Sequence, residues 1–317
     1  MSDSDDIVAN VRRLSGVEAG TGPADIYIAA AVKGFEEVFN YWYIRVMRDV
    51  VKKYRGVLIP RINPFIRRLQ YEGTDCPTFA SKIVEEYSNR NFVTAGGWAL
   101  ERLARSVNPE VQKSAATGID LQRSDPTTSE YHLYVLKSGL VTRNSDIVSA
   151  LKRNSRFAEK LLRQSDPTAK VTMNWVIAAG KTTSTFEDGV RRPSSAEFWA
   201  EVMKLPENEA VELALAIAAE AGRLIRSDAT EHIEALQTVV SAYVATSDHP
   251  MRVDWPFLKI RNFQPKATWS SEDKRRHAKA LEAWMATGYG AAKEVAIESA
   301  ADDLTPDVIQ DVETADE

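Results

Sequence analysis

Hydrophobic and polar positions alternate in the middle of the chain and recur at helical spacing on either side of it. Two runs of apolar, β-branched and aromatic residues, 118–123 and 131–139, flank a polar segment around Pro126, which is the composition of two strands joined by a turn. A third run, 171–179, is dense in β-forming residues and predicts a central strand. We therefore expect a β-hairpin and a further strand in the middle of the chain.

The segments around these strands favour helices. Apolar residues at helical spacing predict one long helix or two between 25 and 54. They also predict a basic helix over 145–164, whose apolar face, including Phe157 and Leu161, is expected to cover the sheet. The expected fold class is α/β (α+β), with a central mixed sheet flanked by helices and with helical additions at both ends.

From residue 194 onward the pattern is again helical, with breaks expected at Pro206 and at Ser227 and Asp228. The first 24 residues lack apolar periodicity, and the last residues hold few large apolar side chains, so both ends are expected to be disordered. Five regions follow: a mostly disordered segment 1–24, a helical, basic and aromatic region 25–90, a sheet-containing core 91–205, a helical region 206–293 and an acidic disordered tail 294–317.

The net charge of −5 hides an uneven distribution of charge. Three aspartates in the first six residues and nine acids after Lys293 have no base among them, and without these twelve acids residues 7–293 carry +7. A body of that sign is compatible with binding phosphates. The single cysteine, Cys76, excludes an intrachain disulfide, and no signal peptide or membrane-spanning apolar run is seen, so we expect a cytoplasmic protein.

A lysine closes the second strand of the predicted hairpin. Alternation along the strand places Lys137 on the same side as Leu133 and Val135, at the end of an apolar face. Burying an ammonium group is costly unless it meets an anion, and Asp120, on the neighbouring strand, is the nearest candidate by sequence. A metal site or a phosphate would meet the same need, and a buried structural ion pair is the alternative interpretation.

This arrangement resembles a known group of nucleases. An aspartate that enters one strand and a lysine that closes the next are similar to the core of the PD-(D/E)XK nuclease superfamily. The flanking residues, Gly118-Ile119-Asp120 and Lys137-Ser138-Gly139 followed by 144–146, resemble more narrowly the PmeII-type group of Type II restriction endonucleases. The resemblance covers about residues 63–199. It implies a restriction-endonuclease-like fold, with 91–205 as the nuclease core, and a metal-dependent endodeoxyribonuclease that acts in restriction or anti-phage defence.

The resemblance also implies roles for individual residues. Asp120 would bind Mg²⁺, with Mn²⁺ as an alternative ion, and Lys137 would contact the scissile phosphate or orient the attacking water. The superfamily usually has an acid two positions before the lysine, where this chain has Val135. Glu101, on a predicted helix upstream of the hairpin, is the candidate for the missing catalytic carboxylate and second metal ligand. A surface pair between Glu101 and Arg105 is the alternative.

Two basic segments are candidates for contacting DNA. Residues 41–70 carry eight bases and one acid, interleaved with aromatic residues, and the helix after the hairpin has a basic face. A dimerisation helix or a solvated face would have the same composition. The predicted contacts to double-stranded DNA are Arg45, Arg48, Lys52 and Lys53 in the first segment and Lys152, Arg153 and Arg156 in the second.

Partners and a second function class follow from the same features. Enzymes of the resembled class commonly act as dimers, so a homodimer is expected, and partner proteins of a defence system remain open. The alternative function is a catalytically weak or inactive DNA-binding or scaffold subunit of a defence complex, because Val135 replaces an acid. A largely helical structural protein is a third interpretation.

Overall fold

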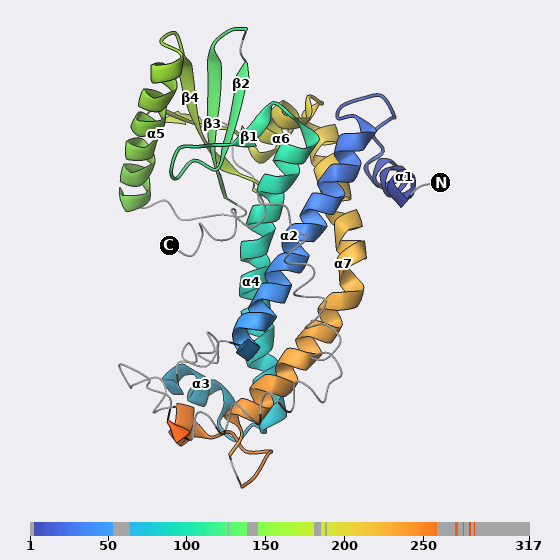
Figure 1. The fold of residues 1–317 in the computed structure, drawn as a ribbon, viewed down its shortest axis with the longest axis vertical. Coiled ribbons are helices and arrows are strands. Elements are labelled where there is room, and N and C mark those ends of the chain that lie inside the picture. Colours follow the sequence, from blue (N-terminus) through green and yellow to red (C-terminus); the bar gives the residue numbers. More distant parts are fainter. Residues whose placement is uncertain are drawn as a thin grey trace. The chain divides into compact units, whose positions relative to one another are not determined.

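The computed structural model describes most of the chain, and the described residues form two compact units (Figure 1). One unit contains 1–38 and 94–224, and the other contains 39–93 and 225–317, so the N-terminal segment groups with the sheet. No helix in the described part is long and apolar enough to cross a membrane. The described residues are 3–52, 64–125, 127–137, 145–180, 185–187, 189–246, 248–258, 270, 271, 275, 279 and 282.

The first unit holds a mixed sheet, as predicted. Within the described residues, six strands lie in the order β1-β2-β3-β4-β6-β5. The strands are β1 (Val111–Lys113), β2 (Leu121–Asp125), β3 (Glu130–Lys137), β4 (Lys170–Ile177), β5 (Thr185–Glu187) and β6 (Val190–Arg192). The predicted hairpin is the antiparallel pair β2–β3, and the predicted central strand is β4, which runs parallel to β3 and to β6. A parallel pair needs a crossover, which here is α5 (Ser145–Ser165).

Helix α5 covers one face of the sheet. The register pairs Leu133 with Met173 and Val135 with Trp175, and these four side chains share a buried cluster with α5 residues. The expectation that α5 uses Phe157 for this contact is wrong, because that side chain is 52% exposed. By helical geometry it lies about 120° round the helix from the buried Leu151. Leu161, at 38% exposed, also lies outside the buried stripe.

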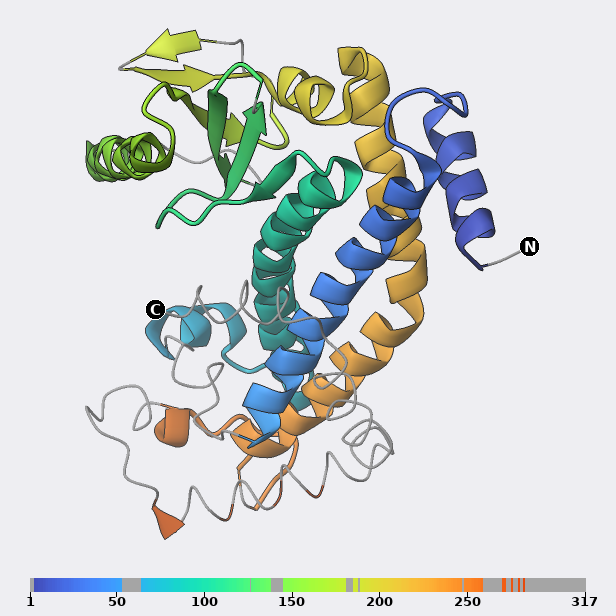
Figure 2. The same cartoon turned by 45° about the horizontal axis from the view of Figure 1, so that its top comes forward.

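The opposite face of the sheet is covered by α6 (Ser195–Met203). Tyr134 is fully buried there, with its ring 5.6 Å from that of Phe198 in an edge-to-face arrangement. The helix starts with a capping box, in which the side chains of Ser194 and Glu197 satisfy each other's backbone N–H groups. Figure 2 shows the two helices, α5 in yellow-green and α6 in gold, on the two sides of the strands.

The N-terminal segment corrects one prediction. Residues 1–24 were expected to be mostly disordered, but α1 (Asp3–Ser15) is a helix that buries Ile7 and Val11. The guanidinium of Arg12 then donates hydrogen bonds to backbone carbonyls of the following loop and to the carboxylate of Asp25, which begins α2 (Asp25–Lys52). The apolar stripe of α1 is short and stands among aspartates, so its periodicity is weak in the sequence.

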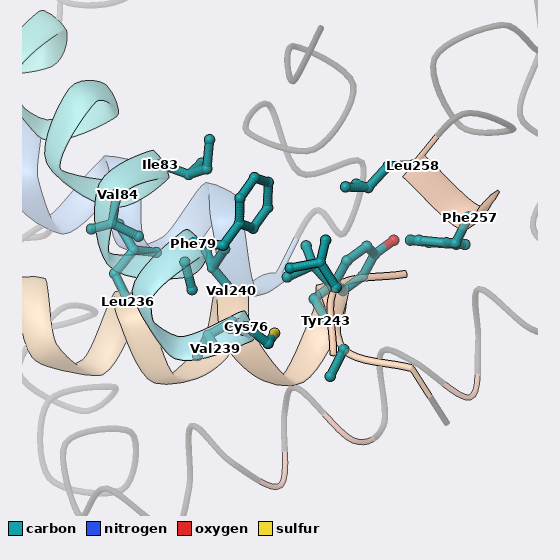
Figure 3. Packing of buried hydrophobic residues seen from close by; sticks show 14 residues of the cluster. Cys76, Phe79, Ile83, Val84, Leu236, Val239, Val240, Tyr243, Phe257 and Leu258 are labelled. Atoms are coloured by element: carbon teal, nitrogen blue, oxygen red, sulfur yellow. The ribbon is translucent and has the colours of Figure 1, made fainter. Parts of the chain in front are cut away.

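The second unit is held by a cluster of apolar side chains (Figure 3). This unit includes α3 (Pro64–Tyr71), the first part of α4 (Cys76–Val107) and the last part of α7 (Glu207–Val244). The ring centroids of Phe79 and Trp255 lie 5.3 Å apart, so an aromatic contact anchors the segment after α7. The expected break at Ser227 and Asp228 is wrong, because α7 is continuous there. The predicted tail 294–317 lies outside the described residues.

Candidate active site

Asp120 and Lys137 lie at the same end of the hairpin. Asp120 directly precedes β2, and its N–H donates to the carbonyl of Tyr134 at 2.9 Å, while Leu121 is the register partner of the same Tyr134. Two consecutive residues therefore oppose one residue of β3, which is the arrangement of a β-bulge. A bulge changes the direction of a side chain, so the local backbone determines where the Asp120 carboxylate points.

The carboxylate of Asp120 points toward the end of β3. Its Oδ2 accepts the backbone N–H of Leu136 at 2.6 Å, one residue before Lys137. Burial raises the pKa of the Asp120 carboxyl, although the nearby Lys137 ammonium and the Leu136 N–H both act to lower it. A carboxylate has about four lone-pair positions, so one hydrogen bond leaves capacity for a cation or a water.

Lys137 stands on a strand end that is tied to α6. Its carbonyl accepts the N–H of Ala178 at 2.7 Å, and the carbonyl of Ala178 in turn accepts the indole N–H of Trp199 at 3.2 Å. The hydroxyl of Ser195 donates to the carbonyl of Gly180 at 2.9 Å. The first turn and a half of α6 is therefore linked by hydrogen bonds to the ends of β3 and β4. These bonds fix the backbone from which the half-buried Lys137 side chain extends.

Val135 occupies the position where the superfamily has an acid. It is 6% exposed and belongs to the apolar cluster under α5, together with Leu133, Leu151 and Trp175. This position is therefore part of the core and supplies no oxygen to the site. A carboxylate placed there would lose most of its hydration, which is costly for an ionised group.

Glu101 is not among the groups that hydrogen-bond to Asp120 or shift its pKa in the described part of the structure. Glu101 is half-buried on α4, beside the buried Leu103 and Ala104. Lys137 is the charged side chain that affects the pKa of Asp120, and within the described residues no three His, Cys, Asp or Glu side chains gather into a metal-binding group. The role of Glu101 as a second carboxylate stays a prediction.

The predicted DNA contacts fall in both units. Arg153 and Arg156 are exposed on α5 and Lys152 is half-buried on the same helix. The other predicted contacts are Arg45, Arg48 and Lys52, whose backbone lies in α2 but whose side chains are outside the described part, and Lys53, which lies outside the described residues altogether.

A second group of charged residues, which the sequence pattern does not reveal, lies on the face of the sheet that α6 covers. The guanidinium of Arg191 contacts the carboxylates of Glu197 and Glu201 and also donates to the side-chain oxygen of Asn174 at 3.4 Å. Asn174 is fully buried, and its amide donates to the carbonyl of Leu133 at 3.2 Å. The sequence signal is the spacing of Glu197 and Glu201 at i, i+4 on α6, whereas no pattern in the sequence marks Arg191 as their partner.

Arg191 and the two glutamates of this second group are paired with one another, so we assign the group a structural role. The two glutamates raise the pKa of Arg191 further above its already high value and hold the guanidinium charged. The hydroxyl of Tyr134 donates to Glu201 at 3.5 Å, and burial raises the pKa of Tyr134. Beside it, burial lowers the pKa of His132, so the imidazole is neutral at pH 7.

A divalent metal would fit the end of the hairpin with few protein ligands. The donor set that the described residues supply is the single carboxylate of Asp120, and Mg²⁺ is commonly held by one or two carboxylates together with waters and substrate phosphate oxygens. The site therefore fits an ion whose coordination is completed by waters and, in the complex, by substrate oxygens.

Comparison with known proteins identifies the family. No curated protein matches the sequence. Residues 35–221, more than half of the chain, match the family described as Type II restriction endonuclease EcoO109I. This match begins earlier and ends later than the resemblance seen over about 63–199, and it includes both Asp120 and Lys137. The chain thus belongs to the Type II restriction endonuclease EcoO109I family and is a DNA-cleaving enzyme of restriction–modification.

Proposed function

We propose that this enzyme hydrolyses phosphodiester bonds of double-stranded DNA at a metal-dependent site built on Asp120 and Lys137. The observation that carries the proposal is the carboxylate of Asp120 at the end of β3, next to the lysine that closes the strand and inside the matched family region. A buried ionisable group whose pKa is shifted and that lies beside a specific charged partner is typical of functional sites.

Each side chain would have its own role. Asp120 would hold Mg²⁺ or Mn²⁺, with waters and phosphate oxygens completing the coordination. When bound, the ion makes water more acidic and offsets charge on the phosphoryl group. Lys137 would place its ammonium beside the scissile phosphate or the attacking water, where a positive charge stabilises developing negative charge. Glu101 would supply the second carboxylate in this proposal, which requires that it approach Asp120 when DNA and metal are bound.

Several finer features belong to the same proposal. The PD-(D/E)XK assignment, and within it the likeness to PmeII-type enzymes, rests on the residues around Asp120 and Lys137. We also propose that the enzyme works as a homodimer in the cytoplasm, where two sites could cut two strands. The exposed Arg153 and Arg156 would contact DNA phosphates, and the basic segment of α2 would contribute further contacts. Partner proteins of a defence system remain part of the hypothesis.

One observation favours a second candidate function. Val135 is embedded in the apolar cluster, so the usual second acid is absent from the hairpin itself. A DNA-binding subunit with weak or no cleavage activity is consistent with that substitution. It would bind DNA through the same basic surfaces without depending on Asp120.

Cleavage of plasmid and phage DNA with Mg²⁺ or Mn²⁺ tests the proposal. Asp120→Asn and Lys137→Ala are each expected to lower the cleavage rate by roughly 10²- to 10³-fold, with DNA affinity retained and with no loss of melting temperature. Matched controls are Glu130→Gln and Lys170→Ala, which alter an exposed acid and base, 3.8 Å apart, at the starts of β3 and β4 and at the other end of β3 from Lys137. The controls are expected to cleave like the wild type.

The same assay separates the two candidate functions. Wild-type cleavage that persists in Asp120→Asn and Lys137→Ala would show that the chemistry lies elsewhere. Wild-type protein that binds DNA and cuts none of the substrates with either metal would favour the binding subunit.

A further inference from the structure

Asn154 is a polar residue on the face of α5 that covers the sheet. Leu151, Ala158 and Leu162, which lie at i, i+7 and i+11, form the buried stripe of α5 in its apolar cluster. Asn154 falls at i+3 on this stripe and is half-buried. Its amide makes no hydrogen bond with the described protein, so a need to satisfy a buried partner does not explain an amide there.

The side chain of Asn154 packs directly on Gly118. Gly118 has a φ of +76°, and a Cβ built on it would lie 2.0 Å from Asn154 Nδ2 and 3.1 Å from its Cγ. The amide therefore fills the space that a side chain at position 118 would need. Glycine is required here for two reasons. A side chain would clash with Asn154, and the left-handed backbone conformation disfavours any residue with a Cβ.

Two hydrogen bonds within residues 114–119 also stabilise the loop that contains Gly118. The N–H of Ala116 bonds to the hydroxyl of Ser114 at 3.2 Å, and the N–H of Ile119 bonds to the carbonyl of Ala116 at 3.1 Å. Ala116 and Ile119 are themselves buried in the cluster under α5. Helix α5 thus packs on this short loop through Asn154 against Gly118, and Ala116 and Ile119 lie in the same apolar cluster as the α5 residues Leu151 and Ala158.

Asp120 follows Gly118 by two residues and starts the bulge against Tyr134. Its carboxylate reaches the N–H of Leu136 at 2.6 Å only if the backbone at Gly118 and Ile119 enters the strand in this direction. We propose that Asn154 is a positioning residue, whose amide packs on Gly118 and fixes the turn that presents the Asp120 carboxylate to the metal ion. This inference rests on the proposed function of Asp120 and extends it to a residue on a different element.

A double-mutant cycle on the full-length protein tests the inference. The dissociation constant for Mn²⁺ is measured by electron paramagnetic resonance without DNA, and the Mn²⁺ concentration for half-maximal cleavage is measured with DNA. The variants are Gly118→Ala, Asn154→Ala, the double variant, Asp120→Asn as reference and Gly189→Ala as control. Gly189 has a φ of +78° with nothing within 4 Å of its Cβ position, so its substitution reports the cost of the backbone conformation alone.

The expected results differ from those of a merely structural role. Residues that orient a metal ligand typically change metal affinity by about 10- to 100-fold, so Gly118→Ala is expected to weaken Mn²⁺ binding within that range, and Asn154→Ala less. The double variant is expected to bind Mn²⁺ more tightly than Gly118→Ala, because removal of the amide makes room for the new Cβ. Gly189→Ala is expected to lower the melting temperature and to leave Mn²⁺ binding unchanged.

Each contrary outcome has a distinct meaning. Asp120→Asn with wild-type Mn²⁺ binding and half-maximal concentration would overturn the metal site itself, and the inference with it. Asp120→Asn that loses binding, together with additive effects in the cycle, would overturn only the positioning role of Asn154. If Gly118→Ala does not fold, Asn154→Ala alone decides, since unchanged Mn²⁺ binding and half-maximal concentration in that variant would overturn the positioning role.

Discussion

Two groups of charged residues in the same sheet behave in opposite ways. On the face that α6 covers, Arg191 contacts Glu197 and Glu201, and these carboxylates stabilise its charged form. At the end of the hairpin, burial raises the pKa of Asp120 despite the neighbouring Lys137. The first group is stabilised in its charged form, whereas burial disfavours the charged form of Asp120.

This difference separates a structural network from a candidate catalytic site. A folded protein stabilises its charges by pairing and hydrogen-bonding them, as the Arg191 network does. Where burial disfavours the charged form of a carboxylate, a bound cation would offset that cost. The comparison therefore predicts that the network contributes to stability and that the Asp120 end contributes to activity.

The largest expected effect is on activity at the hairpin end. Lys137→Ala is expected to reduce cleavage by roughly 10²- to 10³-fold, because the positive charge beside the phosphate is lost. The free energy of unfolding, measured by urea denaturation, is expected to change little. If Lys137→Ala were instead to unfold more easily while cleaving normally, the pair with Asp120 would be structural.

Val135→Glu probes the boundary between the apolar cluster and the site. Because Val135 is buried under α5, the introduced carboxylate is expected to cost about 3 kcal/mol of unfolding free energy. Val135→Ile, which keeps the side chain apolar, is the matched control and is expected to cost less than about 1.5 kcal/mol. Unchanged stability of Val135→Glu with faster cleavage would contradict this expectation and would mean that the acid reaches the metal.

Removal of the Arg191 charge tests the other side of the comparison. Arg191→Leu is expected to cost about 2 kcal/mol, because two neighbouring carboxylates lose their common partner. Lys204→Ala, which breaks an exposed pair with Glu110, is expected to cost about 0.5 kcal/mol or less. Urea denaturation measures both. Equal losses in the two variants would show that the network is no more than a surface contact.

The smallest effect is a gain in stability. A raised pKa in the folded state means that stability falls as pH rises from the ordinary pKa of Asp120 through its folded value. Asp120→Asn removes the charge and keeps an acceptor for the Leu136 N–H, so its melting temperature is expected to exceed that of the wild type at pH 7 by a few degrees at most. The gain is expected to vanish below about pH 4, where the wild-type carboxyl is protonated in both states.

Melting curves with a chelator present, at several pH values, measure this difference. Glu220→Gln is a useful contrast, because Arg223 lowers the pKa of Glu220 and its contribution is lost as pH falls through the folded pKa. An Asp120→Asn variant that is less stable than the wild type at pH 7 would contradict the interpretation that burial destabilises the charged form of Asp120.

The sequence by itself determined the elements that depend on local periodicity. The period of two along 131–137 predicted β3 and placed Val135 and Lys137 on one face, and the register with β4 confirms that placement. Helical spacing predicted α5 over the sheet, because a helix with one apolar face must bury it. The proximity of Lys137 to Asp120 could also be predicted, since a charge at the end of an apolar face requires a partner.

Only the tertiary structure decided the features that depend on contacts between distant segments. Three such features join segments that no local pattern connects. They are the bulge at Asp120, the space at Gly118 that Asn154 fills, and the contact of Arg191 with α6. A glycine in the sequence is compatible with many turns, and it is the packing of α5 on that loop that selects one. Pattern and propensity act over a few residues, whereas the direction of a catalytic side chain is determined by what packs against its backbone.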